Sequence, residues 1–164
     1  MKTPQSAART LLVAWLALFA GAAGPIGASG ASNHGAIETV KEFVAANELA
    51  DLARILDTFD DEATVFFPGG QPQRASGKAE IRAAFAQIFK RRTGPISITV
   101  RDIEVQSFDD VVVVTAHLAA LPPAPVLEST VFPRRTFVLR RAGDRWLIVH
   151  HHASNFTVEP RPLG

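Results

Sequence analysis

The spacing of apolar residues changes once along this chain, from a helical repeat to a strand repeat, and this change restricts the possible folds. Apolar side chains recur every three or four positions over 36–59 and again over 78–92. This spacing predicts two packed helices or one bent helix, followed by a further helix. A short strand is expected at 62–67, and four strands with short connections follow over 95–156. Helices first and an antiparallel meander last indicate an α+β domain.

The N-terminal segment 1–31 is expected to lie outside this domain. Two basic residues precede an apolar run at 11–20, and small residues follow it, which is the order of a secretory signal peptide and its cleavage zone. The run is too short for a membrane anchor. We therefore predict a periplasmic or secreted protein without a stable membrane anchor after cleavage, a domain at 32–158 and a C-terminal tail at 159–164.

Composition excludes several functions. The chain has no cysteine, so disulfides, thiol nucleophiles and thiolate metal sites are absent, and a hydrophobic core must hold the fold together. Its 17 basic and 16 acidic residues nearly balance, and the basic groups are short and separated. This charge pattern predicts no nucleic-acid partner.

Three consecutive histidines end the last predicted strand of a chain that has five histidines altogether. Strand alternation places His150, His152 and Ser154 on the face that carries Trp146, and His151 on the opposite face. If the helices cover the face of Trp146, two imidazoles and a hydroxyl enter one enclosed cavity. The triplet is therefore the first candidate for a site.

A histidine of an earlier predicted strand can join this group. His117 is expected to converge with His150 and His152 across a curved sheet, with Arg135 or Thr136 on the strand between them. Imidazoles at alternate strand positions can share a zinc ion with a water. Without metal, a histidine beside a hydroxyl can move protons or orient a water. The alternative is that one or more of these histidines is structural and inert.

These considerations define the candidate residues, with no cofactor expected other than such a zinc ion. The catalytic candidates are His152, Ser154 and His117, and the ligand-binding candidates are His150, Arg135, Phe67 and Trp146. The ligands of a zinc ion, if one binds, are expected to be His150, His152 and His117.

The order of these motifs resembles a known family. The early helices, "ATVFFPGG", "SGKAEIRAAF", the strand meander and the terminal "DRWLIVHHHAS" together resemble the SnoaL-like and calmodulin-kinase association-domain branch of the NTF2-like superfamily. The resemblance implies a cone-shaped α+β fold, with N-terminal helices packed on a curved antiparallel sheet around a pocket, and frequent dimerisation. Members include isomerases, cyclases, epoxide hydrolases and non-catalytic binding domains, so the fold alone does not decide the function.

A narrower resemblance concerns the histidine run. The exported iota-class carbonic anhydrases end in an HHHSS motif, which reads HHHAS here at 150–154. The resemblance implies that His152 and Ser154 line a carbon dioxide site, with zinc or without metal. Ala153 replaces the first serine of the motif. The chain also has no tyrosine for that family's pocket, and His117 is the nearest substitute.

Three functions follow as hypotheses. The first is an exported domain with an enclosed pocket for a small molecule, acting as an acid–base enzyme. The second is a carbonic anhydrase, and the third is a non-catalytic ligand-binding or dimerisation module. Because the predicted strands are apolar on both faces and the helices can cover only one of them, we also expect a homodimer.

Overall fold

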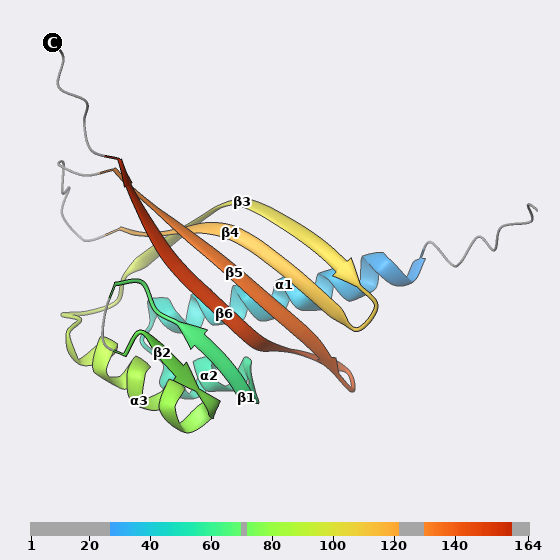
Figure 1. Ribbon diagram of the computed structural model, residues 1–164, viewed down its shortest axis with the longest axis horizontal. Helices are drawn as coiled ribbons and strands as arrows, with labels where there is room; N and C mark the ends of the chain where they lie inside the picture. Colours follow the sequence, from blue (N-terminus) through green and yellow to red (C-terminus); the bar gives the residue numbers. More distant parts are fainter. Residues whose placement is uncertain (1–26, 70–71, 122–129, 159–164) are drawn as a thin grey trace, which may run out of the picture.

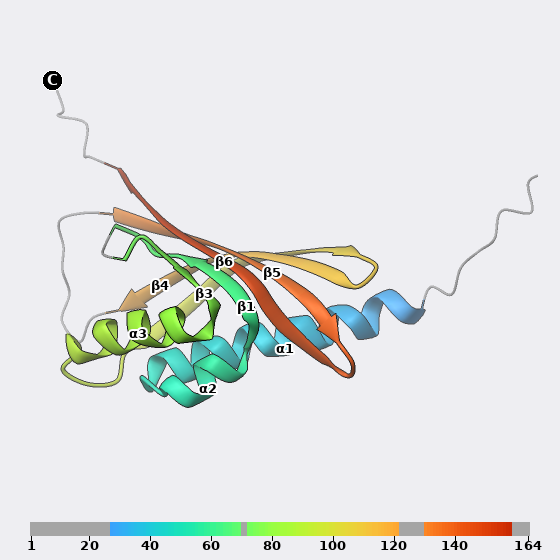
Figure 2. The same cartoon turned by 60° about the horizontal axis from the view of Figure 1, so that its bottom comes forward.

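The computed structural model describes residues 27–69, 72–121 and 130–158, which form one six-stranded sheet with three helices on one of its faces (Figures 1 and 2). In chain order the elements are α1 (Gly27–Glu48), α2 (Leu52–Asp57), β1 (Phe59–Phe66), β2 (Arg74–Ser76), α3 (Gly77–Lys90), β3 (Ser97–Phe108), β4 (Val111–Leu121), β5 (Thr130–Ala142) and β6 (Arg145–Val158).

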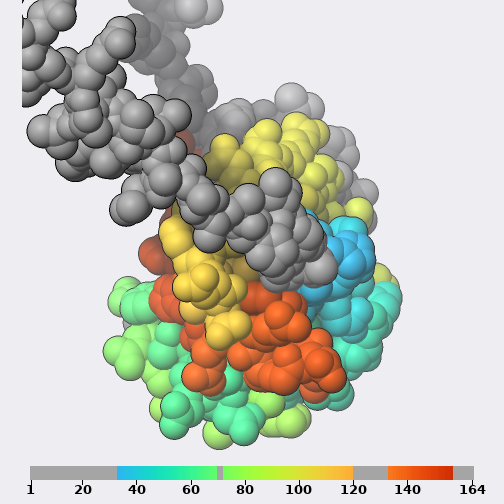
Figure 3. All heavy atoms as spheres, turned by 90° about the vertical axis from the view of Figure 1, so that its right-hand side faces the viewer, coloured from blue at the N-terminus to red at the C-terminus, as the bar shows by residue number. Residues whose placement is uncertain are grey.

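The strand order in the sheet is β2-β1-β6-β5-β4-β3. Strands β3 to β6 form the predicted antiparallel meander. The sheet as a whole is mixed, because β1 pairs in parallel with β6 and antiparallel with β2. Strand β2 was not expected from the sequence, since three residues are too few to show an alternating pattern. Seen from one end, the β3–β4 and β5–β6 turns reach the surface together beside α1 (Figure 3).

The first predicted helical region is divided into two helices. Ala50 adopts a positive φ of 56°, which ends the helical path after α1. Asp51 then caps α2, because its carboxylate accepts a hydrogen bond of 3.1 Å from the backbone N–H of Arg54. Helix α1 begins at Gly27, inside the segment assigned to the cleavage zone; the apolar run at 11–20 lies outside the described residues.

Among the helices of the described residues, none combines the length and the apolar composition needed to cross a membrane.

The hydrophobic core lies between the helices and the sheet face that they cover, here called the inner face. Phe43 of α1 meets the rings of Phe59 and Phe137 edge to face, with centroid distances of 5.8 and 5.4 Å. All three side chains are buried. Removing an aromatic side chain of this kind from water contributes about 2–3 kcal/mol, and edge-to-face packing adds to that. Helix α1 is thereby fixed across the middle of the sheet.

A β-bulge changes the alternation of β6. Leu139 of β5 pairs with Ile148, but the preceding residue of β5, Val138, pairs with His150, so Val149 is an extra residue in β6. A bulge of one residue moves every later side chain to the opposite face. The prediction of unbroken alternation through this part of β6 was wrong.

The consequence for the histidine triplet is a reversal. His151 and Ala153 lie on the inner face with Trp146, and all three are buried. His150 and His152 lie on the opposite face, here called the outer face, where no described helix covers the sheet (Figure 2).

In the sequence of β3 the apolar alternation runs to Val100 and resumes out of step at Ile103, which predicts a slip, and the structure has one. The pairing of β3 with β4 shifts between Arg101 and Glu104, and Asp102 has a positive φ of 52°. This irregularity lies at the edge strand of the sheet, where bulges discourage pairing with other chains.

Candidate ligand-binding cavity

A cavity of about 170 Å³ lies between the inner face of the sheet and helices α1 and α3. Most of its wall is aromatic or aliphatic, and its polar groups are two guanidinium groups, one amide and one imidazole. The lining residues are Phe43, Asn47, Phe67, Pro68, Phe85, Ile88, Arg92, Ile96, Ile98, Leu118, Arg135, His151 and Ala153. An apolar wall with a few polar groups is typical of a small-molecule site.

His151 is the unusual polar group of this wall. Its ring stacks on Phe137 at a centroid distance of 4.5 Å and an interplanar angle of 2°, and it meets the edge of Phe43 at 5.1 Å. Only 4% of the residue is exposed, and neither ring nitrogen has a hydrogen-bond partner among the described residues. Burial, followed by the positive charge of Arg135, lowers the pKa of His151 to about 3. At neutral pH the ring is therefore uncharged, with one N–H donor and one acceptor nitrogen.

Arg135 brings a positive charge to the same cavity. Its Nη1 donates hydrogen bonds to the carbonyl oxygens of Arg134 at 2.8 Å and Ser154 at 3.2 Å. Within the part of the chain that the structure describes, Nε and Nη2 have no partner and no carboxylate lies within 4 Å. Burial lowers the pKa of Arg135 to about 10, so the guanidinium remains charged at neutral pH. Three N–H groups of this side chain are thus available for a ligand.

The second guanidinium is already engaged. Arg92 follows α3 and donates to both the backbone carbonyl and the side-chain oxygen of Asn47 in α1. Its guanidinium also lies over the ring of Phe89, 4.6 Å from the centroid. Burial lowers the pKa of Arg92. No aspartate or glutamate is among the lining residues, so the charge around the cavity is positive.

The other histidines of the predicted site are on the outer face. His150 Nδ1 lies 2.8 Å from the hydroxyl of Thr64, and burial, followed by the charge of His152, lowers its pKa. The ring of His152 is exposed and packs beside the ring of Phe66, with centroids 5.8 Å apart. His117 shares this face, and its Nδ1 lies 2.9 Å from a carboxylate oxygen of Asp102.

These groups do not form the predicted enclosed site. Arg134 of β5 pairs with His117 of β4 on one side and with Ser154 of β6 on the other, so β5 separates these two catalytic candidates. Thr136, also of β5, pairs with His152. Among the described residues, no three histidine or carboxylate side chains are close enough together to hold a metal ion. The proposed zinc ligands therefore share a face without converging.

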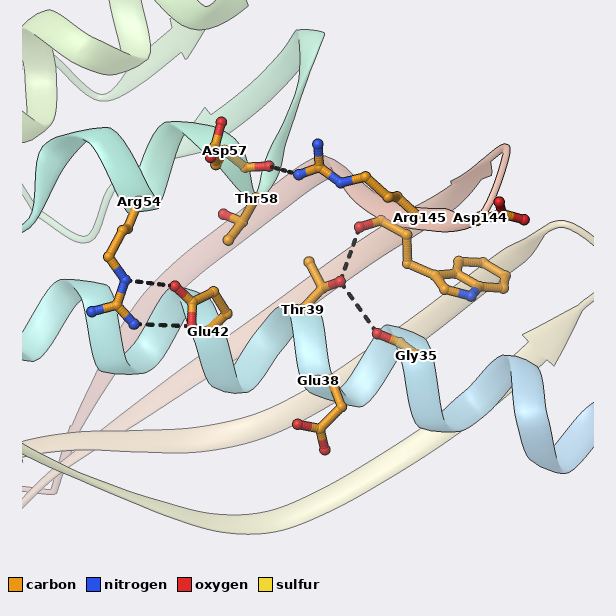
Figure 4. A pocket seen from close by; sticks show the side chains of 10 residues that line it. Gly35, Glu38, Thr39, Glu42, Arg54, Asp57, Thr58, Asp144 and Arg145 are labelled. Atoms are coloured by element: carbon orange, nitrogen blue, oxygen red, sulfur yellow. Dashed lines mark hydrogen bonds and ion pairs between the residues drawn. The ribbon is translucent and has the colours of Figure 1, made fainter.

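Of the predicted ligand-binding residues, Phe67 and Arg135 line this cavity, whereas Trp146 lines a different depression. This second depression, of about 350 Å³, lies beside α1 and the β5–β6 turn (Figure 4). Its polar groups are largely paired with each other. Glu42 binds Arg54 through two bonds of 2.7 and 3.0 Å, and the hydroxyl of Thr39 donates to the carbonyl of Trp146 at 2.9 Å. The cavity that His151 lines, with its unpaired groups, is the better candidate for a site.

Sequence reasoning placed His151 on the wrong face of the strand. The residues before the triplet are apolar at every position from Trp146 to Val149, so alternation gave no sign of a bulge. The three adjacent histidines indicated a site in this region, but not which ring enters the core.

The N-terminal helices packed on one face of a six-stranded mixed sheet define an NTF2-like α+β fold. The family model described as the SnoaL-like domain matches residues 37–159. This chain belongs to the SnoaL-like domain family.

Solved structures agree with this fold. An NTF2-like protein of unknown function from Pseudomonas putida KT2440 is 21% identical with a TM-score of 0.68, covering 77% of this chain and 87% of its own. A candidate dehydratase of the NTF2-like family from Streptomyces avermitilis is 20% identical with a TM-score of 0.66, covering 79% and 99%. A ketosteroid isomerase-like protein from Erwinia carotovora atroseptica is 17% identical with a TM-score of 0.59, covering 77% and 96%. No curated protein matches the chain closely enough to count as a relative.

Proposed function

We propose that this protein binds a small molecule in the cavity between the inner face and helices α1 and α3. The observation that carries the proposal is the His151 side chain, which is buried with both ring nitrogens unpaired among the described residues. Leaving a buried polar group without a partner costs about 1–3 kcal/mol, and native structures rarely keep such a group without a reason. A ligand that forms a hydrogen bond with the imidazole would remove this cost.

The cavity limits the size of the ligand. Its volume of about 170 Å³ is smaller than that of pockets for drug-sized molecules, which begin at about 300 Å³. It corresponds to the liquid volume of about six waters. The proposal is therefore for a compact ligand with an apolar body.

Binding is better supported than acid–base catalysis. Dehydratase and isomerase chemistry needs a group that takes or gives a proton near neutral pH. No carboxylate lines the cavity, and His151, with a pKa of about 3, is a weak base. The similarity to proteins named after a dehydratase or an isomerase supports the fold and not the reaction.

The carbonic anhydrase hypothesis concerns a different place in the molecule. Its residues, His152 and Ser154, follow the bulge and lie on the outer face, away from the cavity. Carbon dioxide hydration measured before and after chelation tests this hypothesis. Activity that is lost in His152→Ala would support it over our proposal, and no hydration by the wild-type protein would remove it.

Export and dimerisation remain proposals. The support for export is the signal-peptide order of residues 1–31, and N-terminal sequencing of the protein recovered from the periplasm or medium would test it. The support for a homodimer is the outer face, where Val113 and Val138 are only half-buried in the single chain.

Filling the cavity tests the binding proposal. A thermal-shift screen with compact organic molecules should identify ligands for the wild-type protein. Ala153→Leu adds bulk to the cavity wall and should abolish the shift. Ser154→Leu, one residue further and on the outer face, is the matched control and should retain it. The proposal would be contradicted if the screen identified no ligand, or if the ligand shifted the melting temperatures of the two variants equally.

A further inference from the structure

We infer that the ligand is a small monoanion, a carboxylate with an apolar body, whose carboxylate is bound jointly by Arg135 and His151. The inference rests on the proposed binding function and adds the chemical class of the ligand. Four observations of the cavity lead to it.

The first observation is an unbalanced charge. Arg135 is half-buried, and the part of the chain that the structure describes brings no carboxylate within 4 Å of it. A buried charge is costly unless an opposite charge or hydrogen bonds compensate it. Two backbone carbonyls satisfy Nη1 only, which leaves the other two nitrogens of the guanidinium for an anion. A carboxylate is the partner that fits the planar fork of this group.

The second observation is the relative position of the two groups. Arg135 pairs with Ala153, and Phe137 pairs with His151, so Arg135 and His151 are diagonal neighbours on adjacent strands of the inner face. Diagonal neighbours are about 7–8 Å apart at the backbone, within reach of one bridging group. The charge of Arg135 contributes to the lowered pKa of His151, which agrees with this proximity. Ala153 has a short side chain and leaves space between the two groups.

The third observation is that the polar groups can act together on one carboxylate. The neutral imidazole of His151 keeps one N–H donor that is unpaired among the described residues. One carboxylate oxygen can accept from this N–H while the other accepts from the guanidinium. Both unpaired groups are then satisfied by a single ligand.

The fourth observation sets the charge and the body of the ligand. Because both Nη atoms of Arg92 already donate to Asn47, Arg135 is the guanidinium that keeps an open two-nitrogen edge, which is one site for one carboxylate group. The opposite wall is aromatic, with the rings of Phe67 and Phe85 in edge contact at 5.5 Å. Such a wall favours an aliphatic or aromatic body over a polar one.

The test compares acids with their neutral amides. The wild-type protein is titrated by calorimetry at pH 7 with three carboxylates, acetate, isovalerate and benzoate. Each carboxylate is compared with its own amide, which is acetamide, isovaleramide or benzamide. We expect at least one carboxylate to bind about 10–100-fold more tightly than its amide, as hydrogen bonds to a charged group would give. Arg135→Gln should reduce this ratio to near one. Arg134→Gln, which removes an exposed guanidinium of the outer face, should leave the ratio unchanged.

Each outcome decides a specific point. An amide that binds as tightly as its acid would overturn the anion inference while leaving small-molecule binding intact. If neither series nor any compound of the screen binds, both proposals fail. Should Arg135→Gln not fold, the wild-type protein still provides a test by NMR. The imidazole signals of His151 should then shift with the carboxylate and not with the amide, and unchanged signals at saturating carboxylate would contradict the inference.

Discussion

At the scale of single residues, His151 shows how burial and charge set the state of a side chain. Its ring lies between Phe43 and Phe137 and close to the guanidinium of Arg135. Low polarity and a nearby positive charge both disfavour the imidazolium form. The side chain therefore acts as a neutral hydrogen-bonding group in the folded protein and regains its ordinary basicity when the chain unfolds.

This difference predicts how stability depends on pH. The folded-state pKa of His151 is about 3 and its ordinary value is 6.5, so below pH 6.5 the unfolded chain binds a proton that the folded protein does not. Its contribution to stability is fully present above that pH and is lost as the pH falls towards 3. The loss should be about 2 kcal/mol between pH 8 and pH 5. Urea unfolding at a series of pH values measures it.

Replacing the ring isolates its contribution. His151→Leu should remove this part of the pH dependence and raise the free energy of unfolding at pH 5 by about 1–3 kcal/mol, because an unpaired buried group is lost. The same variant should no longer respond to the carboxylate ligand. His152→Leu, on the outer face, should keep the wild-type slope. Parallel pH profiles for His151→Leu and the wild type would refute our assignment.

At the scale of elements, the packing of α1 against β6 depends on a close approach at Gly35. A Cβ atom placed on this residue would lie 2.7 Å from Cδ1 of Trp146, a buried ring that has little room to move. The hydroxyl of Thr39 reinforces the same contact by donating to the carbonyl of Trp146 (Figure 4). Helix α1 is thus held against the start of β6, before the bulge that orients His151.

Enlarging Gly35 should separate these elements. Gly35→Val introduces a steric conflict with Trp146 and should lower the free energy of unfolding by about 2 kcal/mol, in the range of overpacked cores. Gly94→Val is the control, since nothing lies within 4 Å of a Cβ atom there, and its stability should stay within about 0.5 kcal/mol of wild type. Chemical unfolding followed by tryptophan fluorescence measures both. Equal stabilities would show that Trp146 moves aside without cost.

At the scale of the whole molecule, the helices cover one face of the sheet, while the outer face keeps apolar side chains among the histidines. Val138 is half-buried there, at the centre of the sheet between Val113 and His150. If a second copy covers this face, a charge at its centre will be strongly unfavourable. The homodimer hypothesis therefore makes a specific prediction for this position.

Val138→Arg should convert the protein to a monomer in sedimentation equilibrium. Gln87→Arg adds the same charge to an exposed position on α3, beyond the opposite face, and should leave the dimer intact. Dissociation in both variants would indicate a general charge effect. A wild-type protein that sediments as a monomer would exclude the hypothesis.

Much of the fold follows from the sequence, because helix and strand periods are local properties. The helices around Phe43 and Phe85, the four-strand meander and the slip in β3 were all predicted from such patterns. Each of these features depends on residues close together in the chain.

The tertiary structure alone decided which histidine enters the cavity. The bulge at Val149 and the parallel pairing of β1 with β6 depend on strands that are distant in sequence, and a shift of one residue exchanges the two faces. It also decided that Arg135 and His151 line the same cavity, and that no carboxylate of the described residues lines it with them. The sequence thus determined the helices and strands, because their periods are local, while the register between distant strands determined which side chains line the cavity.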